Sequence, residues 1–219
     1  MCDEMQRLSG MRMFSGIEAC RLPELLQCLG ARREAYRKGS FIIAEGDAVY
    51  DFGLLLSGSA RAVKWDASGR LVILTLLREG GEVGVVLAAS LAHKSPVTVE
   101  AQDDVSILRI PFEGLFTRCK DESHRHGLLL RNYINIVSEK GLVLHERIDC
   151  LLRPTVREKI WTYLTRVARE RQKSLFSIPM DRNAMAEYLN VERSALSREL
   201  SSMKRDGLLE YYKNTFRIL

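Results

Sequence analysis

The sequence predicts an α+β fold with three parts: a β-rich domain, a long helix and a C-terminal winged helix-turn-helix. Glycine-punctuated apolar segments fill residues 31–110, and apolar residues recur with a 4-3-4-3 spacing along 130–151. Two short helices and a hairpin are expected within 180–219. The predicted domains are 1–111, 112–153 and 154–219.

The first domain opens with a helical, irregular stretch over about 1–30 and continues as short strands. Turn signals at Gly46, Gly58, Gly69 and Gly80 recur at a spacing typical of an antiparallel barrel or sandwich. Pro111 closes the domain. The expected strands include SFIIAEG (40–46), FGLLLSG (52–58), SARAVKW (59–65) and RLVILTLL (70–77).

A long helix is expected from about Glu113 or Asp121 to Asp149. Its apolar residues follow the a/d pattern of a helix that packs against another helix, which favours a homodimer. A single helix packed on its own domain is the alternative. The predicted seam comprises Leu130, Ile134, Val137, Gly141, Leu144 and Ile148, with Leu151 continuing the pattern.

The C-terminal segment reads as two short helices, a sharp turn and a hairpin. The first helix is expected over about Asp181–Leu189 with Asp181 as its N-cap, and Asn190 suits the turn because Asn tolerates a left-handed backbone. The second helix starts near Glu192 or Arg193 and ends before Gly207. Two strands then follow around Lys213. Pro154 marks a hinge before this unit, whose first helix is expected over Val156–Arg169.

The second helix has one apolar face, formed by Leu196, Leu200 and Met203. Its opposite face is rich in Arg and Ser. Such a helix suits the major groove of DNA, where Arg pairs with guanine and Ser donates to a base edge or a phosphate. The groove-facing candidates are Arg193, Ser194, Ser197, Arg198, Ser201 and Arg205.

The net charge of +5 is concentrated in one part of the chain. Residues 154–219 contain 13 Lys and Arg against 8 Asp and Glu, whereas residues 1–153 contain 20 of each sign. A basic segment around the helix-turn-helix is the electrostatic footprint expected of DNA binding.

Other classes of protein are disfavoured. The chain has no apolar run near the ~18 residues that span a bilayer and no apolar signal core, so we expect a cytoplasmic protein without membrane contact. Its five cysteines are expected to be mostly reduced, and an odd number argues against a disulfide framework. No nucleophile–base pairing, metal motif or phosphate loop indicates an enzyme.

The order of β-barrel, long helix and winged helix-turn-helix resembles the Crp/Fnr family of bacterial transcription regulators. The resemblance covers essentially the whole chain, and the segment IPMDRNAMAEYLNVERSALSREL is similar to a clostridial-type subgroup. It implies a double-stranded β-helix, the cyclic-nucleotide-binding-like jelly-roll barrel, as sensor. It also implies a homodimer on palindromic double-stranded DNA, with RNA polymerase as a further partner.

The family resemblance places the effector pocket around Gly81, Glu82, Ser95 and Pro96. Relatives that bind cyclic nucleotides have Gly-Glu followed by an Arg-Ser or Arg-Thr pair, in which Arg holds the phosphate. Gly81-Glu82 matches the first pair, but Ser95-Pro96 stands at the second, and no Arg lies between Arg78 and Arg109. Without that bidentate partner we expect no response to cyclic AMP. A cyclic-nucleotide-binding module acting on a protein partner is the rival function, and such modules lack the helix-turn-helix.

The resemblance also singles out Cys28 and Cys119, since relatives of the subgroup have a Cys at the first position and a Cys-x-x-x-Cys at the second. Ser123 replaces the last Cys here. Thiolate and imidazole are soft ligands for zinc or an iron centre, so Cys20, Cys28, Cys119 and His126 are metal candidates. Haem is a further candidate with no motif behind it. Idle thiols are the alternative, and the effector, a small molecule or a redox signal, stays unidentified.

Overall fold

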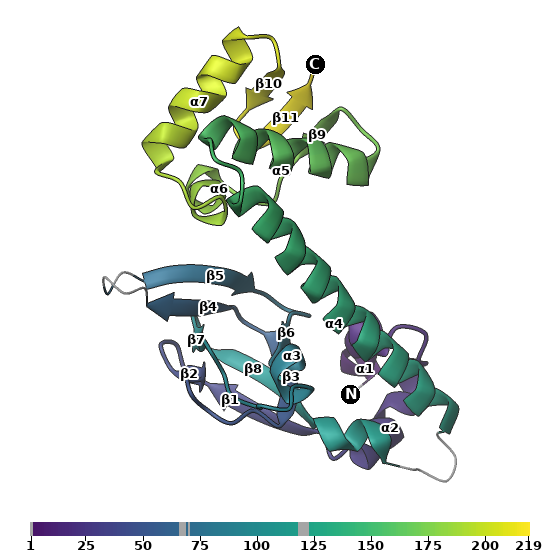
Figure 1. Ribbon diagram of the computed structural model, residues 1–219. Coiled ribbons are helices and arrows are strands. Elements are labelled where there is room, and N and C mark those ends of the chain that lie inside the picture. Colours follow the sequence, from purple (N-terminus) through teal and green to yellow (C-terminus); the bar gives the residue numbers. More distant parts are fainter. Residues whose placement is uncertain (1, 66–68, 70, 118–122) are drawn as a thin grey trace. The chain divides into compact units, whose positions relative to one another are not determined.

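The computed structural model describes residues 2–65, 69, 71–117 and 123–219, without the side chains of 2, 123 and 124. The chain divides into two compact units, Met1–Lys140 and Gly141–Leu219. The long helix α4, Ser123–Leu151, runs continuously through the boundary between them (Figure 1). The helix that was predicted as a separate segment therefore contributes to both units.

In the first unit, eight described strands form two antiparallel four-stranded sheets, which agrees with the predicted jelly-roll barrel (Figure 1). One sheet has the order β1-β8-β3-β6: Arg32–Tyr36, Val105–Pro111, Asp51–Ser57 and Glu82–Val83. The other has the order β2-β7-β4-β5: Phe41–Ile43, Thr98–Ala101, Ala60–Trp65 and Leu71–Leu77. The predicted turn at Gly69 adjoins residues 66–68 and 70, which lie outside the described residues.

The two sheets enclose an apolar core that includes Leu55, Val99 and Ile107. A second core, with Phe14, Phe52 and Leu25 fully buried, lies between the helical segments and the outer face of the first sheet. The helical start of the chain is confirmed. It comprises α1 (Cys2–Ser9), η1 (Arg12–Phe14), η2 (Ala19–Arg21) and α2 (Leu22–Cys28). Two short helices from later in the chain, α3 (Val85–Ala88) and η3 (Phe112–Phe116), also contribute to this core.

The long helix differs from its prediction at the start. Phe112–Phe116 forms a short 3-10 helix, and Thr117 is extended, so α4 does not begin at Glu113. The alternative start, Asp121, lies outside the described residues. Leu129, Tyr133 and Ile136 pack into the second core of the first unit, and the Tyr133 hydroxyl donates to the Val85 carbonyl.

The residues of the predicted seam lie on a different stripe of α4 from Leu129, Tyr133 and Ile136. Leu130 and Val137 are half-buried against the core of their own unit, whereas Ile134, Leu144 and Ile148 are more than half exposed. The alternative of a helix packed on its own domain therefore describes the first half of α4, and the apolar stripe of the second half is uncovered.

The second unit is a winged helix-turn-helix, as predicted (Figure 1). Its first helix begins directly after a capping box, in which Thr155 accepts from the Glu158 backbone amide and Glu158 accepts from that of Thr155. A three-stranded sheet of order β10-β11-β9 adds one strand to the predicted hairpin. The elements are α5 (Val156–Arg171), β9 (Leu175–Ser177), α6 (Arg182–Tyr188), α7 (Arg193–Arg205), β10 (Leu209–Tyr212) and β11 (Thr215–Ile218).

Across the described residues, no helix combines the length and apolarity that a bilayer crossing requires.

Candidate DNA-binding surface

The helix-turn-helix is fixed locally by the residues that the sequence indicated. The Asp181 carboxylate accepts from the Ala184 backbone amide at 2.8 Å and caps α6. Asn190 has φ of +49°, and the Val191 amide closes the turn on the Ala186 carbonyl at 3.0 Å. Gly207, with φ of +71°, follows α7 and allows the chain to reverse into the wing.

Helix α7 buries one face and leaves the other open. Leu196, Leu200 and Met203 are completely buried in the core of the second unit, as their spacing predicted. All six groove-facing candidates lie on the exposed part of the helix: Arg193, Ser194, Ser197, Arg198, Ser201 and Arg205.

These six side chains are not equally free to contact DNA. The Ser201 hydroxyl lies 3.0 Å from the Ser197 carbonyl of its own helix and 3.3 Å from the Tyr211 hydroxyl of the wing. Within the described residues, neither Arg193 nor Arg198 takes part in an ion pair or side-chain hydrogen bond, so both guanidinium groups are uncommitted. Arg198 is therefore better placed than Ser201 to read a base.

Arg157 of α5 holds the recognition helix by bonding acidic and hydroxyl groups along it. Its guanidinium bonds Glu199 at 2.6 Å, Ser202 at 3.0 Å and Asp206 at 2.7 Å. The hydrogen bond to Glu199, followed by that to Asp206, raises the pKa of Arg157. The single positive charge of Arg157 offsets part of the charge of these two carboxylates, and the exposed surface of α7 carries four basic groups, Arg193, Arg198, Lys204 and Arg205.

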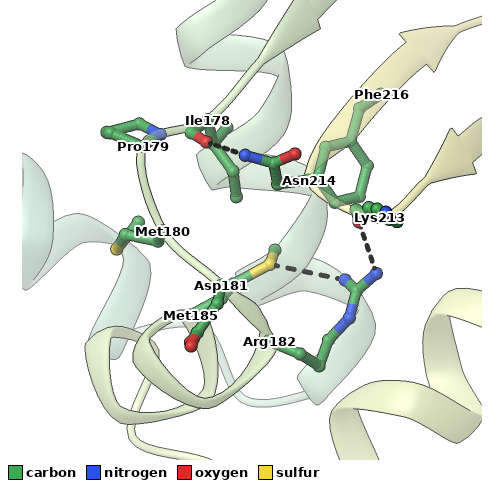
Figure 2. Close-up of a pocket in the computed structure, with 9 residues that line it drawn as sticks. All are labelled: Ile178, Pro179, Met180, Asp181, Arg182, Met185, Lys213, Asn214 and Phe216. Carbon is green, nitrogen blue, oxygen red and sulfur yellow. Dashed lines mark hydrogen bonds between the residues drawn. The ribbon is translucent and has the colours of Figure 1, made fainter.

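The wing is tied to α6 by Arg182, whose guanidinium donates to the Lys213 carbonyl at 2.9 Å (Figure 2). The same group lies 5.1 Å from the Tyr211 ring centroid and 5.6 Å from that of Phe216. Burial lowers the pKa of Arg182. Arg182 and Met185 are among the residues that line an open cavity of about 400 Å³ at the base of the wing, and Figure 2 shows these lining residues. Arg182 and Arg157 were not singled out from the sequence, because their partners are distant along the chain.

The positions predicted for an effector pocket are occupied by contacts within the protein. The Glu82 carboxylate, 9% exposed, lies 3.1 Å from the Lys140 ammonium of α4. Ser95 is buried, and its hydroxyl donates to the Val97 carbonyl at 2.7 Å. Pro96 is exposed, and Gly81 turns the chain into β6 with its amide on the Arg78 carbonyl.

Of the metal candidates, the structure brings Cys28 and His126 together, with 3.5 Å between Sγ and Nε2. Cys28 is disulfide-bonded and Cys150 is a free thiol, so Cys28 is an exception to the expectation of mostly reduced cysteines. Cys20 is a free, exposed thiol, and Cys119 lies outside the described residues. No group of three or more His, Cys, Asp or Glu among the described residues has the geometry of a metal site.

Comparison with known proteins agrees with both units. Residues 33–122 match the cyclic nucleotide-binding domain family, and residues 158–219 match the Crp-like helix-turn-helix domain family. The chain is 27% identical over 193 residues to the transcriptional activator protein FnrA of Stutzerimonas stutzeri, covering 86% of this chain and 77% of FnrA. It is 26% identical over 185 residues to FnrL of Cereibacter sphaeroides, covering 80% of this chain and 71% of FnrL.

Solved structures show the same fold. The catabolite activator protein of Thermus thermophilus superposes with a TM-score of 0.55 at 20% identity, covering 95% of this chain and 93% of that one. The two domain matches, the two relatives and the exposed basic recognition helix place the chain in the Crp/Fnr family of DNA-binding transcription regulators.

Proposed function

We propose that the chain works in the cytoplasm as a homodimer on a palindromic promoter site, with RNA polymerase as a further partner. The observation that carries the DNA-reading part is the uncommitted, exposed Arg198 on a helix whose acidic residues are paired with Arg157. The uncovered stripe of Leu144 and Ile148 supports the dimer. Two symmetric recognition helices need half-sites about 10 bp apart, centre to centre.

Within each half-site we assign Arg198 to a guanine and Arg193 to a phosphate. Guanine presents two acceptors that match the paired donors of a guanidinium, so this contact carries sequence information. A phosphate contact carries none. Ser194 stands where many relatives have Glu, and a hydroxyl lacks the charged acceptor that Glu offers to a cytosine amino group. The half-site is therefore proposed to differ from the usual one, in keeping with the clostridial-type subgroup.

The proposed signal is an unidentified effector or a redox change, and not cyclic AMP. Glu82 is committed to Lys140, and the Ser95 hydroxyl to a backbone carbonyl. The disulfide at Cys28, beside the buried His126, supports the redox alternative. A metal held by Cys20, Cys28, Cys119 and His126 stays a prediction for the protein with the Cys28 disulfide reduced, because the thiolate is the form of Cys that binds a metal.

Selection from randomised duplex DNA, followed by binding measurements on the selected site, tests the reading assignments. Arg198→Ala should cost ~1–3 kcal/mol and relax the preference at one base pair of each half-site. Arg193→Ala should weaken binding to all sequences and reduce the salt slope by about 1. Arg7→Ala, an equal loss of charge at an exposed position of α1, is the control and should leave the consensus unchanged. An untouched consensus in Arg198→Ala would show that the assignment is wrong.

A further inference from the structure

The first unit holds the long helix α4 by apolar contacts, hydrogen bonds and ion pairs. Leu129, Tyr133 and Ile136 are buried. The Asn132 amide donates to the Met13 carbonyl at 3.0 Å and to the Ser15 carbonyl at 2.8 Å. These contacts anchor the N-terminal half of α4 irrespective of charge, because they are apolar or use backbone acceptors.

Two ion pairs follow on neighbouring residues of α4, and they differ in burial. Arg12 pairs with Glu139, and both side chains are more than half exposed. Lys140 pairs with Glu82 of β6, and here the side chains are 32% and 9% exposed. An exposed pair contributes little to stability, whereas a buried carboxylate is costly unless it is paired. The Lys140–Glu82 pair is therefore the more important contact of the two, and the neighbouring Arg12–Glu139 pair serves as its control.

The Lys140–Glu82 pair also has a special place along the helix. Lys140 is the last residue of the first unit, and residues 141–145 are all exposed. Among the described residues, the Lys140–Glu82 pair is the most C-terminal ion pair on the α4 segment of that unit, so it is the last one that ties α4 to the barrel. Glu82 stands on a two-residue edge strand whose backbone pairs with Leu54 of β3. The pair therefore joins the sheet to the helix at their point of separation.

We propose that the Lys140–Glu82 ion pair is an internal clasp that, without a small molecule, holds the dimer helix on the sensor barrel and thereby sets DNA affinity. Lys140 acts as a positioning residue through Glu82. When the clasp is broken, the two recognition helices of a dimer lose their fixed spacing, and DNA binding must restore that order at a cost in free energy. A ligand that bonds Glu82 would act by displacing Lys140. This proposal depends on the proposed dimeric DNA binding.

The test uses full-length protein and a fluorescent duplex that the wild-type protein has selected from random DNA. Lys140→Met and Glu82→Gln should each weaken DNA binding at least about 5-fold, the lower range of allosteric coupling. Lys140→Met should be the more damaging change, because it leaves a nearly buried carboxylate unpaired. The reversed pair, Lys140→Glu with Glu82→Lys, should restore affinity to within about 2-fold. Arg12→Ala, which breaks the exposed pair next to the clasp, should change affinity less than about 2-fold.

Sedimentation and thermal unfolding of every variant separate the clasp from a merely structural role, since the comparison is made on folded dimers. If Lys140→Met does not fold, Glu82→Gln and the reversed pair decide the question. Unchanged or tighter DNA binding in the folded single variants, or a reversed pair no better than the weaker single variant, would overturn the clasp. If the wild-type protein selects no DNA, the proposed function itself fails, and that result precedes any comparison of variants.

Discussion

The uncovered stripe on the second half of α4 allows the strength of the dimer to be estimated. Leu144 and Ile148 are 57% and 52% exposed and lie four residues apart, on one face of the helix. Complete burial of a Leu or Ile contributes roughly 1.5–3 kcal/mol, so covering the exposed half of each contributes about 1 kcal/mol. A two-fold symmetric interface contains both residues from each protomer. The double variant Leu144→Ala/Ile148→Ala should therefore weaken the dimer by about 4 kcal/mol, or roughly 1000-fold in dissociation constant.

Sedimentation equilibrium over a range of concentrations measures this constant directly. Leu142→Ala is the control, because Leu142 is 62% exposed but lies about 200° around the helix from Leu144. Val137 is unsuitable for the test, since it packs against the core of its own unit. A double variant that dimerises as tightly as wild type, or a Leu142→Ala variant that is equally weakened, would refute the seam.

Three further outcomes are expected. The Tyr36 hydroxyl bond, and then the charge of Arg109, lower the pKa of Glu34 below its ordinary 4.5. The stability that Glu34 adds is therefore complete above that value and lost as pH falls through the lowered pKa. Urea unfolding at several pH values should show Glu34→Gln less stable than wild type at pH 7, with the difference vanishing in acid. Burial raises the pKa of the Cys150 thiol, so iodoacetamide should label exposed Cys20 rapidly and Cys150 only on unfolding, as mass spectrometry of the peptides would show. Titration calorimetry with cyclic AMP should detect no binding, and micromolar affinity would contradict our interpretation of Ser95-Pro96.

The local signals in the sequence predicted the DNA-binding unit well. Asp181, Asn190 and Gly207 act where the chain starts a helix, turns or stops one, and their effects depend on nearest neighbours alone. The period of Leu196, Leu200 and Met203 likewise identified the buried face. Such features are readable from one sequence because they need no knowledge of distant residues.

Long-range contacts were not predictable in this way. The a/d pattern on α4 drew attention to one stripe, whereas Leu129, Tyr133 and Ile136 form a second stripe that meets the core of the first unit. A helix with two apolar stripes does not reveal from its period which partner covers each. The Lys140–Glu82 pair was missed for the same reason, since 58 residues separate two ordinary charged side chains.

The last turns of α4 have a consequence for exchanging parts between related regulators. Cys150 is completely buried in the core of the winged unit, Glu146 pairs with Arg166 at 2.9 Å, and Arg147 donates to the Tyr188 carbonyl at 3.3 Å. A chimera joined at Pro154 would place a foreign side chain at the Cys150 position, and a wrong volume there leaves a cavity or a clash. A junction between Lys140 and Gly141 keeps both cores whole. The natural cutting point for a hybrid sensor is therefore inside a helix and not in the loop that follows it.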